Sequence, residues 1–183
     1  MVLVSPLILL SKIEQTLSDR EIFFTIGAEL LTFAPTPLGS YARLAYYRWT
    51  LQACSLDVYF GFGSWVSHRT ARIGHHVAIG GRTCIGTATI GDHVLIGSRV
   101  SILSGGRQHE VADREQPLGT EPPHYERVHV GSNTWIGDGA ILMADVGSRC
   151  VVAAGAVVMR AADDEKLVQG NPARAITRDW QSQ

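Results

Sequence analysis

The polar segment 104–127 holds the residues with the clearest capacity for chemistry. It contains His109 and His124, two of the seven histidines of the chain. Imidazole has an ordinary pKa of about 6.5, so near neutral pH it can accept a proton from an attacking hydroxyl group. Glu110 and Asp113 lie close enough in sequence to orient the His109 ring, although solvated positions are the simpler interpretation for both. Taken alone, a histidine in such a segment is also most simply a solvated residue. Long loops in compact domains are usually functional or disordered, so the segment is a candidate site.

The histidines of the chain also allow a second chemistry, the binding of a metal ion. A catalytic zinc ion needs three protein ligands, often three imidazoles. His124 and His129 have a workable spacing for two of them, and a third could come from His75, His76 or His93. A zinc site therefore stands as an alternative to acid–base chemistry.

Composition narrows the class of protein. The chain has 183 residues, 45% of them hydrophobic and 18% charged, with a net charge of −1. A buried core is therefore expected, and a nucleic-acid-binding surface is not. The cysteines Cys54, Cys84 and Cys150 show no CxxC spacing, which argues against a zinc knuckle or a disulfide framework and favours a cytoplasmic location.

The first ten residues are apolar, but they have no basic region before the apolar run and Pro6 interrupts them. Neither a signal peptide nor a membrane span is expected from this pattern. Peripheral contact with a membrane surface is the less favoured interpretation of the same residues.

The elements that must position the site come from a repeat of six residues. An aliphatic residue leads each hexad, glycine often follows it, and the fifth residue is small or β-branched. The leading residues are Ile73, Ile79, Ile85, Ile90, Ile96, Ile102, Val130, Ile136, Leu142, Val146, Val152 and Val158, with shortened steps before Ile90 and Val146. A period of six fits neither an ordinary strand nor an α-helix. It predicts short strands that coil three to a turn as a left-handed parallel β-helix, an all-β fold. A β-sandwich of short strands would not keep so many hexads in phase.

The repeat divides the chain into three parts. We expect a mainly helical N-terminal cap over residues 1–57, the β-helix with its insertion (104–127) over residues 58–162, and a C-terminal tail over residues 163–183. Within the cap, residues 10–31 and 39–51 have helical patterns. Apolar residues on one face of the second pattern would cover the open first coil, as an uncapped solenoid end requires. These residues are Leu44, Tyr47 and Leu51.

Several motifs resemble the hexapeptide-repeat acyltransferases, especially the maltose and galactoside O-acetyltransferases and the colanic-acid-type exopolysaccharide acetyltransferases. The similarity covers roughly residues 65–178. It includes the hexads at Ile90 and Val130, the insertion with an early histidine, and the segment Gly170-Asn-Pro-Ala-Arg174.

The resemblance implies a homotrimer that binds acetyl-CoA between neighbouring subunits and needs no metal. It implies that His109 is the catalytic base for direct transfer of an acetyl group to a sugar or polysaccharide-type hydroxyl, or to an amine. The family's acceptor-binding carboxylate lies in a coil that is shortened here, near residues 85–89, which weakens the case for a simple sugar. The implied CoA contacts are Asp138, Ala154, Met159, Arg160 and Arg174, and Trp135 either walls the acyl site or packs at a subunit interface.

Two other classes stay open at this point. One is a zinc protein like the γ-class carbonic anhydrases, which share the β-helix and hold their zinc with three histidines across two subunits. The other is a β-helix without catalytic activity that serves as a scaffold. Bound zinc would favour the first class, and failure to bind CoA would favour the second.

Overall fold

The computed structural model describes residues 4–106, 108 and 124–177. Its main body is a solenoid of short parallel strands in three sheets, here called A, B and C. Sheet A contains β1 (Ala53–Cys54), β4 (Arg72–Ile73), β7 (Ala88–Ile90) and β10 (Val128–Val130). Sheet B contains β2 (Tyr59–Phe60), β5 (Ala78–Ile79), β8 (Leu95–Ile96), β11 (Trp135–Ile136), β13 (Val151–Val152), β15 (Lys166–Gly170) and β16 (Ala173–Thr177). Sheet C contains β3 (Trp65–Val66), β6 (Cys84–Ile85), β9 (Ser101–Ile102), β12 (Ile141–Leu142) and β14 (Val157–Val158). The predicted left-handed parallel β-helix is confirmed.

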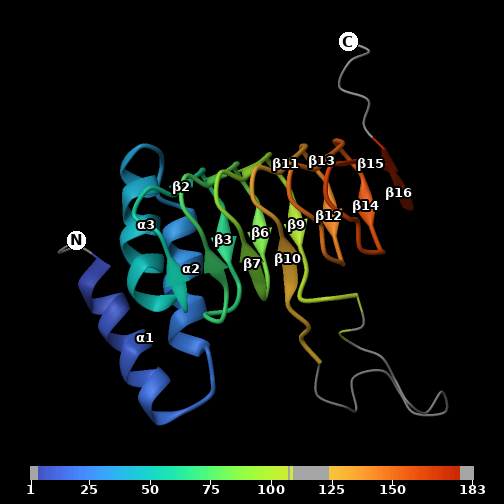
Figure 1. Ribbon diagram of the computed structural model, residues 1–183. Helices are drawn as coiled ribbons and strands as arrows, with labels where there is room; N and C mark the ends of the chain where they lie inside the picture. The colour runs from blue at the N-terminus through green and yellow to red at the C-terminus, as the bar shows by residue number, and fades with distance from the viewer. Residues whose placement is uncertain (1–3, 107, 109–123, 178–183) are drawn as a thin grey trace.

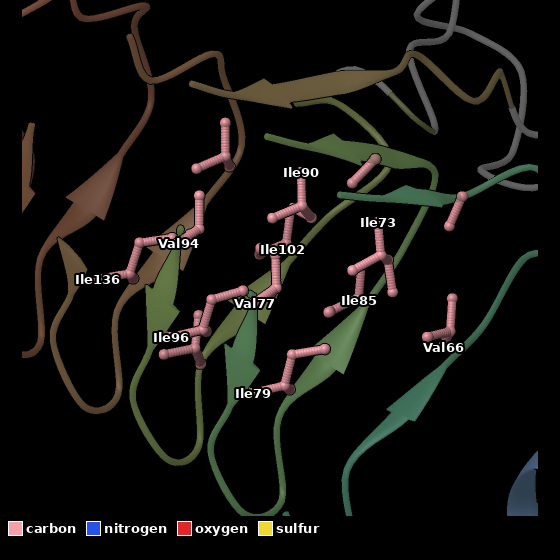
Figure 2. Close-up of a cluster of buried hydrophobic side chains, with 14 of the residues drawn as sticks. Val66, Ile73, Val77, Ile79, Ile85, Ile90, Val94, Ile96, Ile102 and Ile136 are labelled. Atoms are coloured by element: carbon pink, nitrogen blue, oxygen red, sulfur yellow. The ribbon is translucent and has the colours of Figure 1, made fainter. Parts of the chain in front are cut away.

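The leading aliphatic residue of each hexad is the inward residue of its strand. Ile73 pairs in register with Ile90, and Ile79 pairs with Ile96, so identical side chains stack from coil to coil. Figure 2 shows these side chains converging on the axis of the solenoid. All four are at most 4% exposed, and stacking of this kind supplies the hydrophobic stabilisation of the fold.

Three helices form the cap at the N-terminal end of the solenoid, as Figure 1 shows. They are α1 (Ser5–Leu17), α2 (Ile22–Thr32) and α3 (Leu38–Thr50). The single helical stretch expected over residues 10–31 is in fact two helices. The Glu14 carboxylate accepts hydrogen bonds from the backbone N–H groups of Phe23 and Phe24 at 3.0 and 3.2 Å. It thereby satisfies donors that the start of α2 would otherwise leave unpaired.

Burial alone would raise the pKa of Glu14, but these backbone N–H groups and the Arg69 guanidinium favour the charged carboxylate and lower its pKa below the ordinary 4.5. Arg69, which follows β3, donates from Nη2 to the Glu14 carboxylate at 2.8 Å and to the carbonyl of Arg20 at 2.9 Å. Glu21 accepts a hydrogen bond from the backbone N–H of Arg69 and lies 2.8 Å from His68 Nδ1. The cap and the solenoid are therefore joined by a charged network that the repeat pattern does not reveal.

The third helix closes the first coil, as predicted. Tyr47 is fully buried, its ring centre lies 4.9 Å from that of Phe60, and its hydroxyl accepts a hydrogen bond from the backbone N–H of Val66 at 2.9 Å. Arg43 is also fully buried, and its guanidinium donates to the carbonyls of Leu31 and Phe60. The cap thus satisfies backbone groups at the open end as well as covering apolar side chains.

The solenoid begins at Ala53, a few residues before the boundary expected from the repeat. At its other end β15 and β16 form an antiparallel hairpin on the last coil of sheet B, across the turn at residues 170–173. Among the described residues, no helix is both long and apolar enough to cross a membrane.

Candidate active site

A cleft of about 500 Å³ opens where the insertion joins the solenoid. The insertion leaves the solenoid after β9 and rejoins it at β10, at the corner between sheets C and A (the CA corner). The cleft is lined by Gly105, Gly106, Glu126, Arg127, Val128, Met143, Ala144, Asp145, Met159 and Ala161. It therefore lies between the base of the insertion and the two coils that follow.

The described ends of the insertion run side by side. The N–H of Glu126 donates to the carbonyl of Ser104, and the N–H of His124 donates to that of Gln108, both at 3.0 Å. Gly105 has a φ of +85°, and a Cβ there would come within 2.7 Å of the Glu126 Cβ. Glycine is required at this position because the two described ends of the insertion approach each other so closely. The candidate base His109, with Glu110 and Asp113, lies outside the described residues. His109 is the next residue after Gln108.

The shortened coil at residues 85–89 lies next to the base of the insertion. Its corner, Gly86-Thr87, lies under the insertion, and the N–H of Thr87 donates to the buried Ser104 hydroxyl at 2.8 Å. Arg127, at the returning end of the insertion, donates to the carbonyls of Thr70 and Ala88. The short corner therefore makes room for the anchored base of the insertion.

Two of the predicted CoA contacts lie at the same corner as the insertion. Met159 lines the cleft, is 57% exposed, and follows Val158, which pairs with Leu142. Arg160 is the next residue and is also exposed. Met159 is therefore available to a ligand in the cleft, and Arg160 is exposed next to it without lining the cleft.

Two more predicted contacts lie at the other edge of sheet C, at the corner between sheets B and C (the BC corner). The pairing of Ile136 with Val152 brings Asp138 and Ala154 to equivalent positions in adjacent coils. Ala154 is exposed. The carboxylate of Asp138 accepts a hydrogen bond from the backbone N–H of Ser98 at 2.8 Å.

That hydrogen bond indicates a structural role for Asp138. Asp92, Asp145 and Asp164 make the same kind of bond, each accepting at 2.7–2.8 Å from a backbone N–H one coil away. Asp92, Asp138 and Asp164 stand two residues after the inward residue of their coils, whereas Asp145 stands directly before Val146. Aspartates at two positions of the hexad thus join neighbouring coils. Nothing in the hexad pattern distinguishes this role from ligand binding.

The same corner exposes bare backbone beside Ala154. Gly139 and Gly155 have φ values of +69° and +70°, and a Cβ at either would meet nothing within 4 Å. Arg82 and Arg99 hold the equivalent positions of the two preceding coils with φ of +56°. The fold therefore accepts a side chain at this position, and the two glycines leave the backbone open to a ligand or a neighbouring subunit.

Arg174 lies on β16, where it pairs with Gln169 and is exposed. Trp135 lies on the outward face of sheet B, 54% exposed and in register with Leu95. It does not line the cleft. The predicted contacts therefore form separate groups within one chain, on the two corners that flank sheet C and on the C-terminal hairpin.

The histidines considered for zinc are distributed over different sites. His76 and His93 stack at 4.8 Å between ring centres, and both His75 and His76 lie within 3.4 Å of Asp57. His124 lies instead at the base of the insertion, 4.0 Å from Glu126. Across residues 4–106, 108 and 124–177, no group of three or more histidine, cysteine or acidic residues is arranged to hold a metal ion.

Comparisons with known proteins agree with the fold. The family model described as the hexapeptide repeat of succinyl-transferase matches residues 87–106 and 127–160. A Saccharomyces cerevisiae protein, YJL218W, provisionally named an acetyltransferase, is 35% identical over 81 residues, which cover 43% of this chain and 39% of that protein. The chain thus matches well under half of this curated relative.

Solved structures match over a larger share of the chain. The hexapeptide-repeat acetyltransferase VCA0836 of Vibrio cholerae is 27% identical with a TM-score of 0.62, over 83% of this chain and 88% of that one. The same protein has been solved with acetyl-CoA, and that structure is 24% identical with a TM-score of 0.59 over 81% of both chains. A maltose O-acetyltransferase from Clostridium difficile 630 is 22% identical with a TM-score of 0.68, over 84% of this chain and 85% of that one. The chain therefore carries the repeat and the fold of the hexapeptide-repeat proteins, and the predicted resemblance to the acetyltransferases among them is confirmed.

Proposed function

We propose that the protein is a CoA-dependent acetyltransferase whose acceptor is a hydroxyl group of a sugar or polysaccharide-type molecule. One observation carries the proposal: the insertion that contains His109 is anchored beside a cleft lined by Met159, on a fold shared with the V. cholerae acetyltransferase. A cleft of about 500 Å³ falls in the usual size range of small-molecule sites.

The reaction needs a base and no covalent intermediate. The acceptor oxygen attacks the thioester carbonyl carbon, and the imidazole of His109 takes the hydroxyl proton. The C–S bond then breaks, and the same proton is returned to the departing sulfur of CoA. Backbone N–H groups would stabilise the developing oxyanion.

The cysteines support direct transfer. All three are free thiols, and burial raises the pKa of Cys54 to about 12 and that of Cys84 to about 11. A thiol with such a pKa carries almost no thiolate near neutral pH, and the thiolate is the nucleophilic form. Acyl transfer through Cys54 or Cys84 is therefore disfavoured.

The separate positions of the predicted CoA contacts support a site shared between subunits. Sheet C lies between the CA corner, with Met159 and Arg160, and the BC corner, with Ala154 and the open glycines. In a homotrimer the CA corner of one copy can face the BC corner of the next, so CoA would lie between them. Arg160 and Arg174 are then candidates to pair with the CoA phosphates, since a guanidinium binds phosphate in a bidentate manner.

A binding and turnover assay tests the proposal. Calorimetric titration should show acetyl-CoA binding to purified protein, and thiol release should depend on one class of acceptor in a panel of glycosides, nucleotide sugars, oligosaccharides and amines. No acetyl-CoA binding at millimolar concentration would contradict the proposal and favour a scaffold.

A further inference from the structure

The first helix exposes more large apolar side chains than an ordinary surface helix does. The residues it buries most deeply are polar: Ser11 and Glu14 are only 2% and 7% exposed. Leu7 and Ile8 are partly buried and pack against the core, but the other large apolar side chains of α1 are exposed. Leu9 is 61% exposed, Leu10 42%, Ile13 46% and Leu17 79%. An amphipathic helix of a globular protein normally turns its apolar stripe toward the core.

The orientation of α1 is fixed by charged hydrogen bonds. Glu14 accepts from the start of α2 and from Arg69 Nη2, and the Arg69 side chain is only 11% exposed. Turning α1 to bury Leu10 and Ile13 would break this network and leave the Arg69 guanidinium without its carboxylate partner. Loss of a buried charge partner is strongly destabilising, so the apolar stripe stays outside.

The second helix adds a further exposed stripe to the same cap. Phe24, Ala28 and Leu31 are buried on one side of α2. The opposite side exposes large apolar residues: Ile22 52%, Phe23 44%, Ile26 43%, Leu30 55% and Phe33 79%. A helix that is apolar on both sides is normally covered on both sides. The amount of apolar surface on the cap is typical of a face that meets a partner or a membrane.

Charge and aromatic residues favour a lipid surface as the occupant. The exposed charged residues of the three cap helices are Lys12 on α1, Arg48 on α3 and Glu29 on α2, so the α1 and α3 side of the cap carries only basic exposed charge. Trp49 is 53% exposed and forms a shallow apolar groove with Pro6, Leu9 and Lys12. Tryptophan and lysine beside an apolar stripe are typical of helices that lie in the interface of a bilayer.

We infer that the helical cap is a membrane-docking surface: α1 lies in the headgroup region of an anionic phospholipid bilayer with Leu9, Leu10, Ile13 and Leu17 inserted and Lys12 against the phosphates. The surface lies at the end of the solenoid opposite the C-terminal hairpin, separate from the cleft at the insertion (Figure 1). The inference does not depend on the acetyltransferase activity.

Co-flotation with vesicles tests this docking without any substrate. The full chain should float with vesicles of phosphatidylcholine and phosphatidylglycerol, and it should bind pure phosphatidylcholine vesicles more weakly. Ile13→Glu should lower the affinity by about tenfold or more, because a charge replaces an inserted apolar side chain. The matched control is Gln15→Glu, which adds the same charge to an exposed polar position of the same helix. Gln15 accepts a hydrogen bond from Lys12 at 3.2 Å, so this control also measures how far an acidic group beside Lys12 weakens binding, and Ile13→Glu should weaken it further.

Three outcomes would overturn the inference. The first is wild-type protein that does not float with anionic vesicles. The second is equal flotation of Ile13→Glu and Gln15→Glu. The third is a wild-type oligomer, measured by light scattering without lipid, that Ile13→Glu dissociates and Gln15→Glu does not, because a second copy would then cover the stripe. Circular dichroism of both variants checks that the cap is folded.

Discussion

Removing the hydroxyl group of Tyr47 should measure how strongly the cap closes the solenoid. The hydroxyl is fully buried and accepts a hydrogen bond from the backbone N–H of Val66 at 2.9 Å. In Tyr47→Phe the ring stays against Phe60, but the buried N–H loses its partner, which costs about 1–3 kcal/mol. For a chain of this size that loss corresponds to a fall in Tm of about 2–4 °C per kcal/mol.

Urea unfolding at one fixed protein concentration is the assay, with Tyr41→Phe as the control because Tyr41 is 70% exposed on the same helix. Burial raises the pKa of Tyr47 far above its ordinary value of 10, so the hydroxyl stays neutral and the stability difference should be the same at pH 6 and pH 9. Equal stability of the Tyr47→Phe and Tyr41→Phe proteins would refute the reasoning.

Three other predictions concern the charged network and the shared site. The pKa of Glu14 in the folded protein is below its ordinary value of 4.5, so its contribution to stability is complete above pH 4.5 and is lost as the pH falls through the folded pKa. Glu14→Gln should therefore flatten the acid side of a curve of unfolding free energy against pH. An unchanged acid side would contradict this. Arg174→Ala should weaken CoA binding by about 1–3 kcal/mol in calorimetry, whereas Arg72→Ala on the outward face of sheet A should not; equal effects would argue against a phosphate contact. His109→Ala and Ala154→Trp chains, inactive separately, should regain activity when co-expressed, because mixed trimers contain sites with neither change; no activity in any mixture would contradict a site shared between copies.

The hexad pattern predicts the solenoid well because each coil has the same local requirement. An inward aliphatic residue such as Ile79 must stack on its counterpart Ile96, so the six-residue step is visible in the sequence. The coils before Ile73 carry a weaker sequence signal, because their inward residues include Cys54 and Phe60 in place of a leading isoleucine. Helical spacing predicts which cap residues cover the first coil, and the buried Tyr47 confirms that prediction.

The contacts that hold the cap could not be predicted in the same way. Glu14 and Arg69 are distant in sequence and belong to no repeat, so only the folded chain brings them together. The hexad position of Asp138 predicts its place at a corner, but it does not separate a ligand contact from the bond to Ser98. The sequence alone does not show that Gly155 leaves the backbone open at its corner. That becomes visible only when the coil register identifies Arg82 and Arg99 as its equivalents in earlier coils.

The rate of acetyl-CoA-dependent thiol release by His109→Ala, measured with the acceptor that the panel identifies, tests the central claim most directly. The proposed mechanism predicts a loss of about 10²–10⁴-fold in kcat, as expected for removal of a general base, with CoA affinity unchanged. His124→Ala, a second histidine of the same insertion, should keep most of the activity. Wild-type turnover in the His109→Ala protein would contradict the assignment of the base.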